Sequence, residues 1–355
     1  MTAPASPTPS TRSGPTWDAA DLQRAWDAMA SARHVLISTH VNTDGDGVSS
    51  ALTMAAIAQT ANPHARVTTV IPDGNMPPTL DFVPGIETMV RYMGQPLSLD
   101  DVDLIIAPDV PEVRRFGPLY EDYQAVFARV PVIIVDHHVA RGEEPALARF
   151  IDTSVIAAQS LIHRLIGQWG VPITPTMATL LLTGMVTDSG SFERVEGNGA
   201  PTFRTVAELC DAGGDFGLIM EGTRRRKMPG TVAAWGAILS HATWVGQVVW
   251  TEFTPEMIAA TGANEVDGEG VINWLVGTRD VGAAVIFYRR GDGWRAGLRS
   301  TTPKVNVSAF AQRYGGGGHV MASGCTFPGG TAERDAFLAA LVTYTEAGLA
   351  SSTDS

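Results

Sequence analysis

The sequence predicts an α/β fold in two domains, and three observations support this prediction. Short runs rich in valine and isoleucine alternate with amphipathic helical stretches through the first half of the chain. After residue 213 the pattern changes to strands with a hairpin signal at "RRGDGW", mixed with helices. The length of 355 residues is enough for two hydrophobic cores. We therefore expect an N-terminal domain whose mainly parallel sheet is sandwiched by helices, a linker, and a smaller C-terminal α+β domain.

The first half supplies the strands and helices of the parallel sheet. The expected strands are "HVLISTH", "RVTTVIP", "VDLIIAPDV" and "PVIIVDHHV". The expected helices are "GVSSALTMAAIAQTA", "EVRRFGPLYEDYQAVFARV", "VIAAQSLIHRLIGQWG" and "PTMATLLLTGMVTDSGSF", of which the last delivers Asp188 at its end. Near-continuous Val and Ile runs are typical of strands buried on both faces, as in a parallel sheet covered by helices.

The domain boundaries follow from shifts in composition. We expect a disordered leader rich in Pro, Ser and Thr at 1–16, an N-terminal domain at 17–212, a linker rich in Gly and charge at 213–231, and a C-terminal domain at 232–350. In the last of these, the expected strands are "TWVGQVVWTEF", "VGAAVIFYRR" and "GWRAGLRST", and "TAERDAFLAALVTYTEAG" is the closing helix.

Composition excludes several classes of protein. The net charge of −12 argues against binding to long or duplex nucleic acid, which needs Lys and Arg, but it leaves short nucleotides open. Cys210 and Cys325 are far apart, so neither a disulfide scaffold nor a zinc-thiolate site is indicated. The leader has no apolar core of a signal peptide, and no stretch reaches the ~18 apolar residues of a membrane span. We expect a cytoplasmic protein without a membrane partner.

Acids and imidazoles gather where the predicted strands end. They are His40, Asp44, Asp46, Asp109, Asp136, His137, His138 and, at the end of a helix, Asp188. Ligands of open parallel sheets bind at the carboxyl ends of the strands, so these side chains are expected at one edge. Asp44 or Asp109 alone would be more typical of a helix N-cap or a turn. Together, the set predicts a site for two divalent cations.

Five segments carry a resemblance to a known family. "STHVNTDGDGVSS", "APDVPEVRRFG", "VDHH" and "TDSGSF" resemble, in order and spacing, the four motifs of the DHH phosphoesterase superfamily. "GLRSTTPKVNVSAFAQRYGGGGHVMASG" resembles its partner domain, DHHA1. The resemblance covers the chain from about Trp17 to Thr345, and it is closest to the bifunctional oligoribonuclease (nanoRNase) and pAp phosphatase branch. Thr43, where the family usually has Pro, and Gly47 are small departures that leave every ligand in place.

The resemblance implies the roles of the site residues. The implied metal ligands are His40, Asp44, Asp46, Asp109, His137 and Asp188. His40 and Asp44 would hold one ion, completed by Asp188. Asp46 and His137 would hold the other, and Asp109 would bridge both. His138 would face the substrate phosphate or the leaving oxygen, whereas Asp136 either ligates or orients a neighbouring histidine. Manganese is the metal that the family favours.

Substrate contacts are expected mainly in the second domain. By the resemblance, Arg299, Ser300 and His319 would hold a terminal phosphate or a base from across a cleft between the domains. Gly316, Gly317 and Gly318 belong to a glycine run whose backbone N–H groups either face an anion or form a flexible loop. Arg115 would contact phosphate from the first domain, with Arg114 equally placed by spacing.

Two further features leave their roles open. The basic run from Arg224 to Lys227 fits a solvated linker as well as a surface that steers nucleotides. Trp274 is expected in the core, with base stacking as the alternative.

The resemblance implies a metal-dependent phosphoesterase. It would hydrolyse short single-stranded RNA (nanoRNA) to mononucleotides, and pAp to AMP, through a hydroxide activated by two metal ions. The alternative is cleavage of cyclic di-AMP or of the dinucleotide pApA by the same site. A nucleotide-binding sensor without catalysis would need a missing ligand, and every ligand position is filled. A homodimer is common among such relatives.

Overall fold

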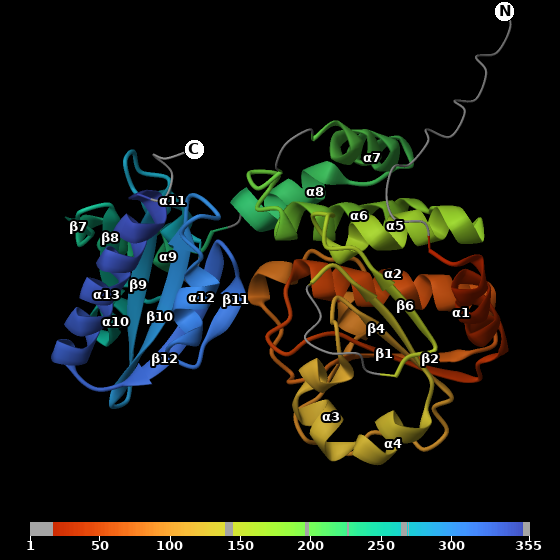
Figure 1. Ribbon diagram of the computed structural model, residues 1–355. Helices are drawn as coiled ribbons and strands as arrows, with labels where there is room; N and C mark the ends of the chain where they lie inside the picture. Colours follow the sequence, from red (N-terminus) through yellow and green to blue (C-terminus); the bar gives the residue numbers. More distant parts are fainter. Residues whose placement is uncertain are drawn as a thin grey trace, which may run out of the picture. The chain divides into compact units, whose positions relative to one another are not determined.

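The structure is a computed structural model that describes residues 17–138, 145–195, 199–225, 227–263, 268 and 270–350. The expected leader, the last five residues and Arg226 lie outside these residues. The chain divides into two compact units, with the boundary between Arg226 and Lys227 (Figure 1). Within the described residues, no helix has the length and apolar character that crossing a membrane requires.

Unit 1 contains the predicted parallel sheet. Its six strands run in the order β3-β2-β1-β4-β5-β6, and each neighbouring pair is parallel. The strands are β1 His34–Ser38, β2 Arg66–Ile71, β3 Val90–Arg91, β4 Leu104–Pro108, β5 Val132–Asp136 and β6 Ala148–Ile151. The Val- and Ile-rich runs at β1, β4 and β5 are buried along their whole length, which confirms the prediction of a sheet covered on both faces.

Helices cover both faces of this sheet, because side chains along each strand alternate between them. Val35 and Ile37 pack with α1, α2, α5 and α6, whereas Leu36 packs with α3 and α4 on the opposite face (Figure 1). The helices are α1 Ala19–Ser31, α2 Gly45–Ala61, α3 Pro118–Asp122, α4 Gln124–Arg129, α5 Ala158–Trp169, α6 Pro175–Asp188, α7 Ala200–Asp211 and α8 Phe216–Met220, with 3₁₀ turns at Pro78–Leu80, Ile86–Thr88 and Val113–Phe116. Two apolar layers therefore enclose the sheet.

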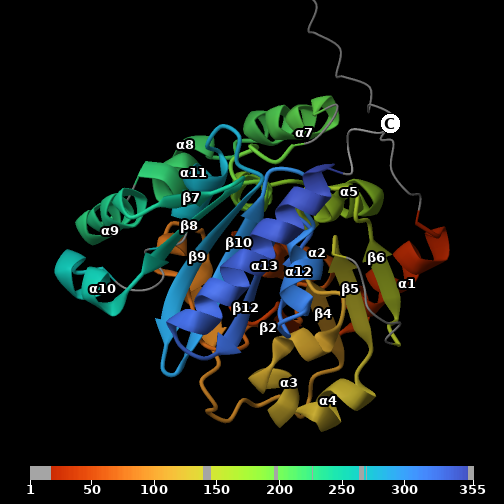
Figure 2. The ribbon, with the colours of Figure 1, turned by 60° about the vertical axis from the view of Figure 1, so that its left-hand side comes forward.

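Unit 2 contains a second six-stranded sheet, in the order β11-β12-β10-β9-β8-β7. Its pairs are antiparallel except β8 with β9, and the hairpin predicted at "RRGDGW" joins β9 to β10. Figure 2 shows α13 lying along one face, where Phe337 packs on Phe287 and Phe310. The elements are α9 Pro229–Ser240, β7 Thr243–Val245, β8 Val248–Phe253, α10 Pro255–Thr261, α11 Val271–Val276, β9 Ala283–Arg290, β10 Gly293–Ser300, α12 Val307–Gln312, β11 Gly317–His319, β12 Ala322–Pro328 and α13 Thr331–Ala350.

The segment expected as a linker, 213–231, contains regular structure. It holds α8, a π-helical turn at Glu221–Arg225 and the start of α9. Asp215 caps α8 by accepting a hydrogen bond from the backbone N–H of Leu218 (2.8 Å), and Ile219 is buried in the core of unit 1. An N-cap and an apolar face thus make a helix of a stretch whose composition resembles a loop.

Trp274 is exposed, so the prediction that it lies in the core is wrong. Its side chain is 66% exposed on α11, which instead buries Val271, Ile272 and Leu275. These three residues form the buried face of the short helix, and Trp274 lies outside it.

Candidate metal centre

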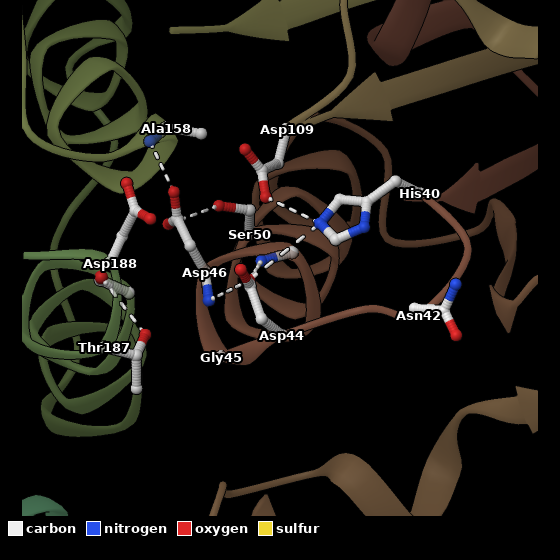
Figure 3. A network of polar contacts seen from close by, with 12 residues as sticks. His40, Asn42, Asp44, Gly45, Asp46, Ser50, Asp109, Ala158, Thr187 and Asp188 are labelled. Atoms are coloured by element: carbon white, nitrogen blue, oxygen red, sulfur yellow. Dashed lines mark hydrogen bonds and ion pairs between the residues drawn. The ribbon is translucent and has the colours of Figure 1, made fainter. Parts of the chain in front are cut away.

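The loop between β1 and α2 places the first ligands. Asp44 is the N-cap of α2 and accepts hydrogen bonds from the backbone N–H groups of Asp46 (3.0 Å) and Gly47 (3.1 Å). The capping role considered for Asp44 is therefore present, and the same carboxylate lies 3.9 Å from Nε2 of His40. Asn42 adopts a positive φ of 53°, and its N–H donates to Asp73. The turn is held at both ends and directs His40 and Asp44 toward one another (Figure 3).

Asp109 lies at the centre of the cluster. It follows β4 directly, with a φ of 59° that only a few non-glycine residues adopt, and its N–H donates to Val135 of β5 (2.8 Å). One carboxylate oxygen lies 3.3 Å from Nε2 of His40, and the other lies 3.6 Å from Nε2 of His137. Because its two oxygens face different histidines, Asp109 has the position of a bridging ligand.

Asp46 belongs to the first turn of α2 and is buried. Its carboxylate accepts hydrogen bonds from the backbone N–H of Ala158 (2.6 Å, Figure 3) and from that of Gln159 (3.2 Å), at the start of α5. Ala157, the N-cap of α5, has no capping side chain. Asp46 therefore caps α5 from another helix, which fixes the carboxylate and balances part of its charge.

Asp188 is the last residue of α6, as the sequence predicted. One of its carboxylate oxygens lies 3.3 Å from Nε2 of His137, and a carboxylate oxygen of Asp46 lies 4.0 Å from the same nitrogen. Asp188 is thus grouped with Asp46 and His137. The family motif implied instead that Asp188 completes the site of His40 and Asp44. The structure differs because the end of α6 brings Asp188 to His137.

His138 and Asp136 form a pair beside the ligands. Nδ1 of His138 lies 2.9 Å from Asp136, which is fully buried at the end of β5, and 3.6 Å from Asp109. Of the two roles left open for Asp136, this contact favours orientation of the neighbouring imidazole.

The residues of the cluster fit divalent cations. Three sets of ligand atoms lie within 4.8 Å of one another: His40, Asp44 and Asp109; Asp46, His137 and Asp188; and Asp109, His137 and His138. Among the described residues, Oδ1 of Asp109 and Nε2 of His137 are buried without a hydrogen-bond partner. Buried polar atoms are normally satisfied, so these two atoms indicate a missing partner that accepts oxygen and imidazole ligands.

The electrostatics of the cluster lead to the same conclusion. Burial alone lowers the pKa of His40, but the hydrogen bond to Asp109 and the charges of Asp109 and Asp44 outweigh it and raise the pKa to about 9. Burial, together with neighbouring carboxylates, raises the pKa of Asp46 well above its usual range and that of Asp188 to about 6. Without a cation these acids repel one another, and bound cations relieve the repulsion.

Glycines allow the helices of the site to approach one another, which was not predicted from the sequence. A Cβ on Gly184 of α6 would overlap the carboxylate of Asp46 and lie 2.5 Å from Cγ of Gln159. A Cβ on Gly45 of α2 would lie 2.5 Å from the side chain of Thr187. A glycine inside the helical pattern "LLLTGMVTD" was the available signal, because such a glycine often has a packing reason. The N–H groups of Ala158 and Gln159 that bind Asp46 could not be found from the sequence, because every residue except proline supplies a backbone N–H.

The glycine run forms part of a hairpin, which differs from the flexible loop considered for it, and its role toward an anion stays a prediction. Gly317–His319 is strand β11 and pairs with β12. A Cβ on Gly316 or Gly318 would collide with the backbone of β12, and Gly318 has a φ of 140°. Glycine is therefore required here by close backbone packing.

The predicted substrate residues of unit 2 lie close together. Arg299 of β10 and His319 of β11 are both paired with Ala322 of β12, so they stand in one row across three strands. Ser300, the next residue of β10, is buried. Arg115, in unit 1, has an exposed side chain, and its carbonyl accepts a hydrogen bond from the N–H of Val41 beside His40. Whether these residues bind substrate stays a prediction.

A parallel α/β domain with this ligand cluster, followed by a mixed-sheet domain, defines a class of two-domain metal-site proteins. The family model described as "DHH family, N-terminal domain" matches residues 34–185, and that of the "DHHA1 domain" matches residues 255–347. The chain therefore carries a DHH-family N-terminal domain followed by a DHHA1 domain, as the sequence motifs predicted.

Named relatives match most of the chain, and a solved structure shares its fold. The chain is 28% identical over 318 residues to "Bifunctional oligoribonuclease and PAP phosphatase NrnA" of Thermus thermophilus, covering 86% of this chain and 90% of that protein. The protein of the same name from Bacillus subtilis is 24% identical, with 82% and 88% covered. The fold is similar to the crystal structure of an exopolyphosphatase-related protein from Bacteroides fragilis, with a TM-score of 0.85, 22% identity, and 93% and 97% of the two chains covered.

Proposed function

We propose that this protein is a metal-dependent phosphoesterase that hydrolyses short RNA oligonucleotides to mononucleotides, and pAp to AMP. The observation that carries the proposal is the buried cluster in which Asp109 faces both His40 and His137. The relatives named as oligoribonuclease and PAP phosphatase support the class of substrate, since the match extends over most of both chains.

The proposed chemistry divides between ligands and orienting groups. His40, Asp44 and Asp109 would hold one divalent ion, and Asp46, His137 and Asp188 the other, with Asp109 shared. Such ions neutralise charge on phosphoryl oxygens and lower the pKa of water, and manganese suits a mixed set of carboxylates and imidazoles. The N–H groups of Ala158 and Gln159 hold Asp46 in place.

His138 is proposed to act on the substrate and not as a permanent ligand. Its imidazole is partly exposed, and Asp136 holds it from behind. Burial lowers its pKa, but the hydrogen bond to Asp136 and the charge of Asp109 outweigh burial and raise it. A protonated His138 donates to a phosphoryl or leaving-group oxygen, which is the role that pairing with a buried carboxylate supports.

The DHHA1 unit is proposed to bind the remainder of the substrate. Arg299 and His319 flank Ala322 in one row of the sheet, and Ser300 follows Arg299. These three residues of unit 2 offer a small set of groups for one terminal phosphate or one base, and Arg115 of unit 1 is proposed as a phosphate contact in its own unit. Gly317 and Gly318 pair with β12. We therefore assign substrate binding to the side chains of Arg299, Ser300 and His319 in preference to the backbone N–H groups of the glycine run.

A substrate panel at fixed Mn²⁺ tests this function. The substrates are pAp, pApA, cyclic di-AMP, RNAs of increasing length and an RNA duplex. Each added phosphate improves binding only where a cation meets it, and the net charge of −12 provides no long basic track. We expect kcat/KM to be highest for RNAs of about two to five nucleotides, a range that the resemblance to the family implies. It should fall steeply with length and be negligible on duplexes.

The other outcomes of the panel are equally informative. Preference for cyclic di-AMP or pApA would replace the proposed substrate with the alternative while retaining the site. Equal or better activity on a long single strand would contradict the proposal.

A further inference from the structure

The loop that follows Asp188 has an unusual backbone. Gly190, Ser191 and Phe192 have φ values of 64°, 62° and 70°, so three consecutive residues are left-handed. Two of them carry a Cβ, for which this conformation is unfavourable. Such a loop persists only where its surroundings hold it, and it begins two residues after a proposed metal ligand.

Part of the support for this loop comes from residues that lie next to it in the chain and from α7. The N–H of Ser191 donates to the carbonyl of Val186 (2.7 Å), and the N–H of Phe192 donates to Oγ of Ser189 (2.8 Å). The ring of Phe192 packs on Phe203, with centroids 5.5 Å apart. These contacts anchor the inner side of the loop.

Arg224 supplies the contacts on the outer side. Its Nε donates to Oγ of Ser191 (2.8 Å), and one terminal nitrogen donates to the carbonyl of Gly190 (2.8 Å) and to the carboxylate of Glu193 (2.9 Å). A planar guanidinium suits this arrangement, because its donors are fixed in a fork. Arg224 belongs to the π-helical turn Glu221–Arg225, a rare geometry that often occurs at functional sites.

The loop is coupled directly to the ligand. Arg194, at its end, donates a hydrogen bond to the backbone carbonyl of Asp188. The carboxylate of Asp188 is grouped with Asp46 and His137 in one set of candidate ligands. The contacts of the loop therefore hold the end of α6 from which this carboxylate projects.

We propose that Arg224 is a positioning residue of the metal centre, which holds the left-handed loop at Gly190–Glu193 so that Asp188 stays beside Asp46 and His137. The sequence offered only two roles for the basic run to which Arg224 belongs, a solvated linker or a surface that steers nucleotides. The proposal rests on the proposed metal site but not on the identity of the substrate.

The test compares two neighbouring arginines of the same turn. Arg224→Gln removes the guanidinium that donates hydrogen bonds to Gly190, Ser191 and Glu193. Arg225→Gln removes the same charge from a side chain that is 70% exposed and lies 4.0 Å from Glu221. Calorimetric titration of the metal-stripped, full-length variants with Mn²⁺ alone gives the affinity of each site. We expect Arg224→Gln to weaken one of two sites by about 10- to 100-fold, as loss of groups that orient a ligand does, and Arg225→Gln to bind as the wild type does.

Conservative variants separate positioning from charge. Arg224→Lys keeps the charge but loses the fork, so it should restore only part of the affinity. Should Arg224→Gln not fold, Ser191→Ala removes the hydroxyl that accepts a hydrogen bond from Arg224. This variant should show a smaller loss of Mn²⁺ affinity at the same site. Equal Mn²⁺ binding by Arg224→Gln, Ser191→Ala and the wild type would overturn the proposal. Equal rises of KM in both arginine variants, with normal metal binding, would instead assign the run to nucleotide steering. Because Mn²⁺ is titrated without nucleotide, failure of the proposed substrate leaves this test intact.

Discussion

Replacing Gly184 by alanine tests how the helices of the metal centre pack. Gly184 is inside α6, where alanine is favoured by about 1 kcal/mol on helix propensity alone. Here, however, the new methyl group would overlap the carboxylate of Asp46 and come within 2.5 Å of Gln159 and 3.0 Å of Oγ of Ser49. Overpacking of this kind costs about 1–3 kcal/mol. We expect Gly184→Ala to lower the free energy of unfolding by up to about 2 kcal/mol.

The same substitution should weaken metal binding, because Asp46 cannot keep both its place and its hydrogen bonds to α5. We expect Mn²⁺ affinity to fall about tenfold or more, measured by calorimetric titration of the metal-stripped protein. Gly236→Ala is the matched control: Gly236 is inside α9, and nothing lies within 4 Å of its Cβ position. That variant should be slightly stabilised and should bind Mn²⁺ normally. A Gly184→Ala protein that melts higher and binds Mn²⁺ as tightly as the wild type would refute this account.

Three further predictions concern the ligands, the DHHA1 unit and pH. Asp109→Ala should nearly abolish turnover while the circular dichroism spectrum stays that of a folded protein, because one carboxylate faces both sites; unchanged turnover in excess Mn²⁺ would contradict a shared ligand. Arg299→Ala or His319→Ala should raise KM for phosphate-terminated substrates and leave the Mn²⁺ content normal, and metal loss in either variant would place that residue in the metal centre. The raised pKa of His40, about 9 against 6.5, stabilises the metal-free fold fully below pH 6.5, and this contribution is lost as the pH rises through about 9. The raised pKa of Asp188 acts with the same sign between pH 3.8 and about 6. The melting temperature of the metal-free protein should therefore fall from pH 6.5 to 9. This fall corresponds to a loss of about 3 kcal/mol at most in the free energy of unfolding, and saturating Mn²⁺ should remove it.

The sequence predicted the sheet and the ligands because both leave local patterns. The buried runs at β1, β4 and β5 are nearly pure Val, Ile and Leu, which is the pattern of parallel strands covered on both faces. Acids and imidazoles directly after such strands must meet at one edge of the sheet, so the positions of Asp109 and His137 followed from connectivity alone.

What the sequence did not predict depends on contacts between distant segments. The pairing of Asp46 with the N–H groups of Ala158 and Gln159 joins residues more than a hundred positions apart. Composition also misrepresented 213–231, where the N-cap Asp215 and the buried Ile219 make a helix within a stretch rich in Gly and charge. Arg224 was indistinguishable from its basic neighbours, because only the fold reveals which guanidinium meets the loop.

The carboxylates of the proposed metal centre differ in how far helix dipoles stabilise them, and this difference explains where further contacts lie. Asp44 and Asp46 stand at the N-terminus of α2, and Asp46 also faces the N-terminus of α5, where helix dipoles favour negative charge. Asp188 stands at the C-terminus of α6, where the dipole opposes negative charge, and burial raises the pKa of its carboxyl to about 6. The ligand that the helices disfavour is thus the one followed by a left-handed loop with a guanidinium on its outer side. A carboxylate in that position needs positive charge and fixed geometry from elsewhere in the chain, and the contacts of Arg194 and Arg224 supply both.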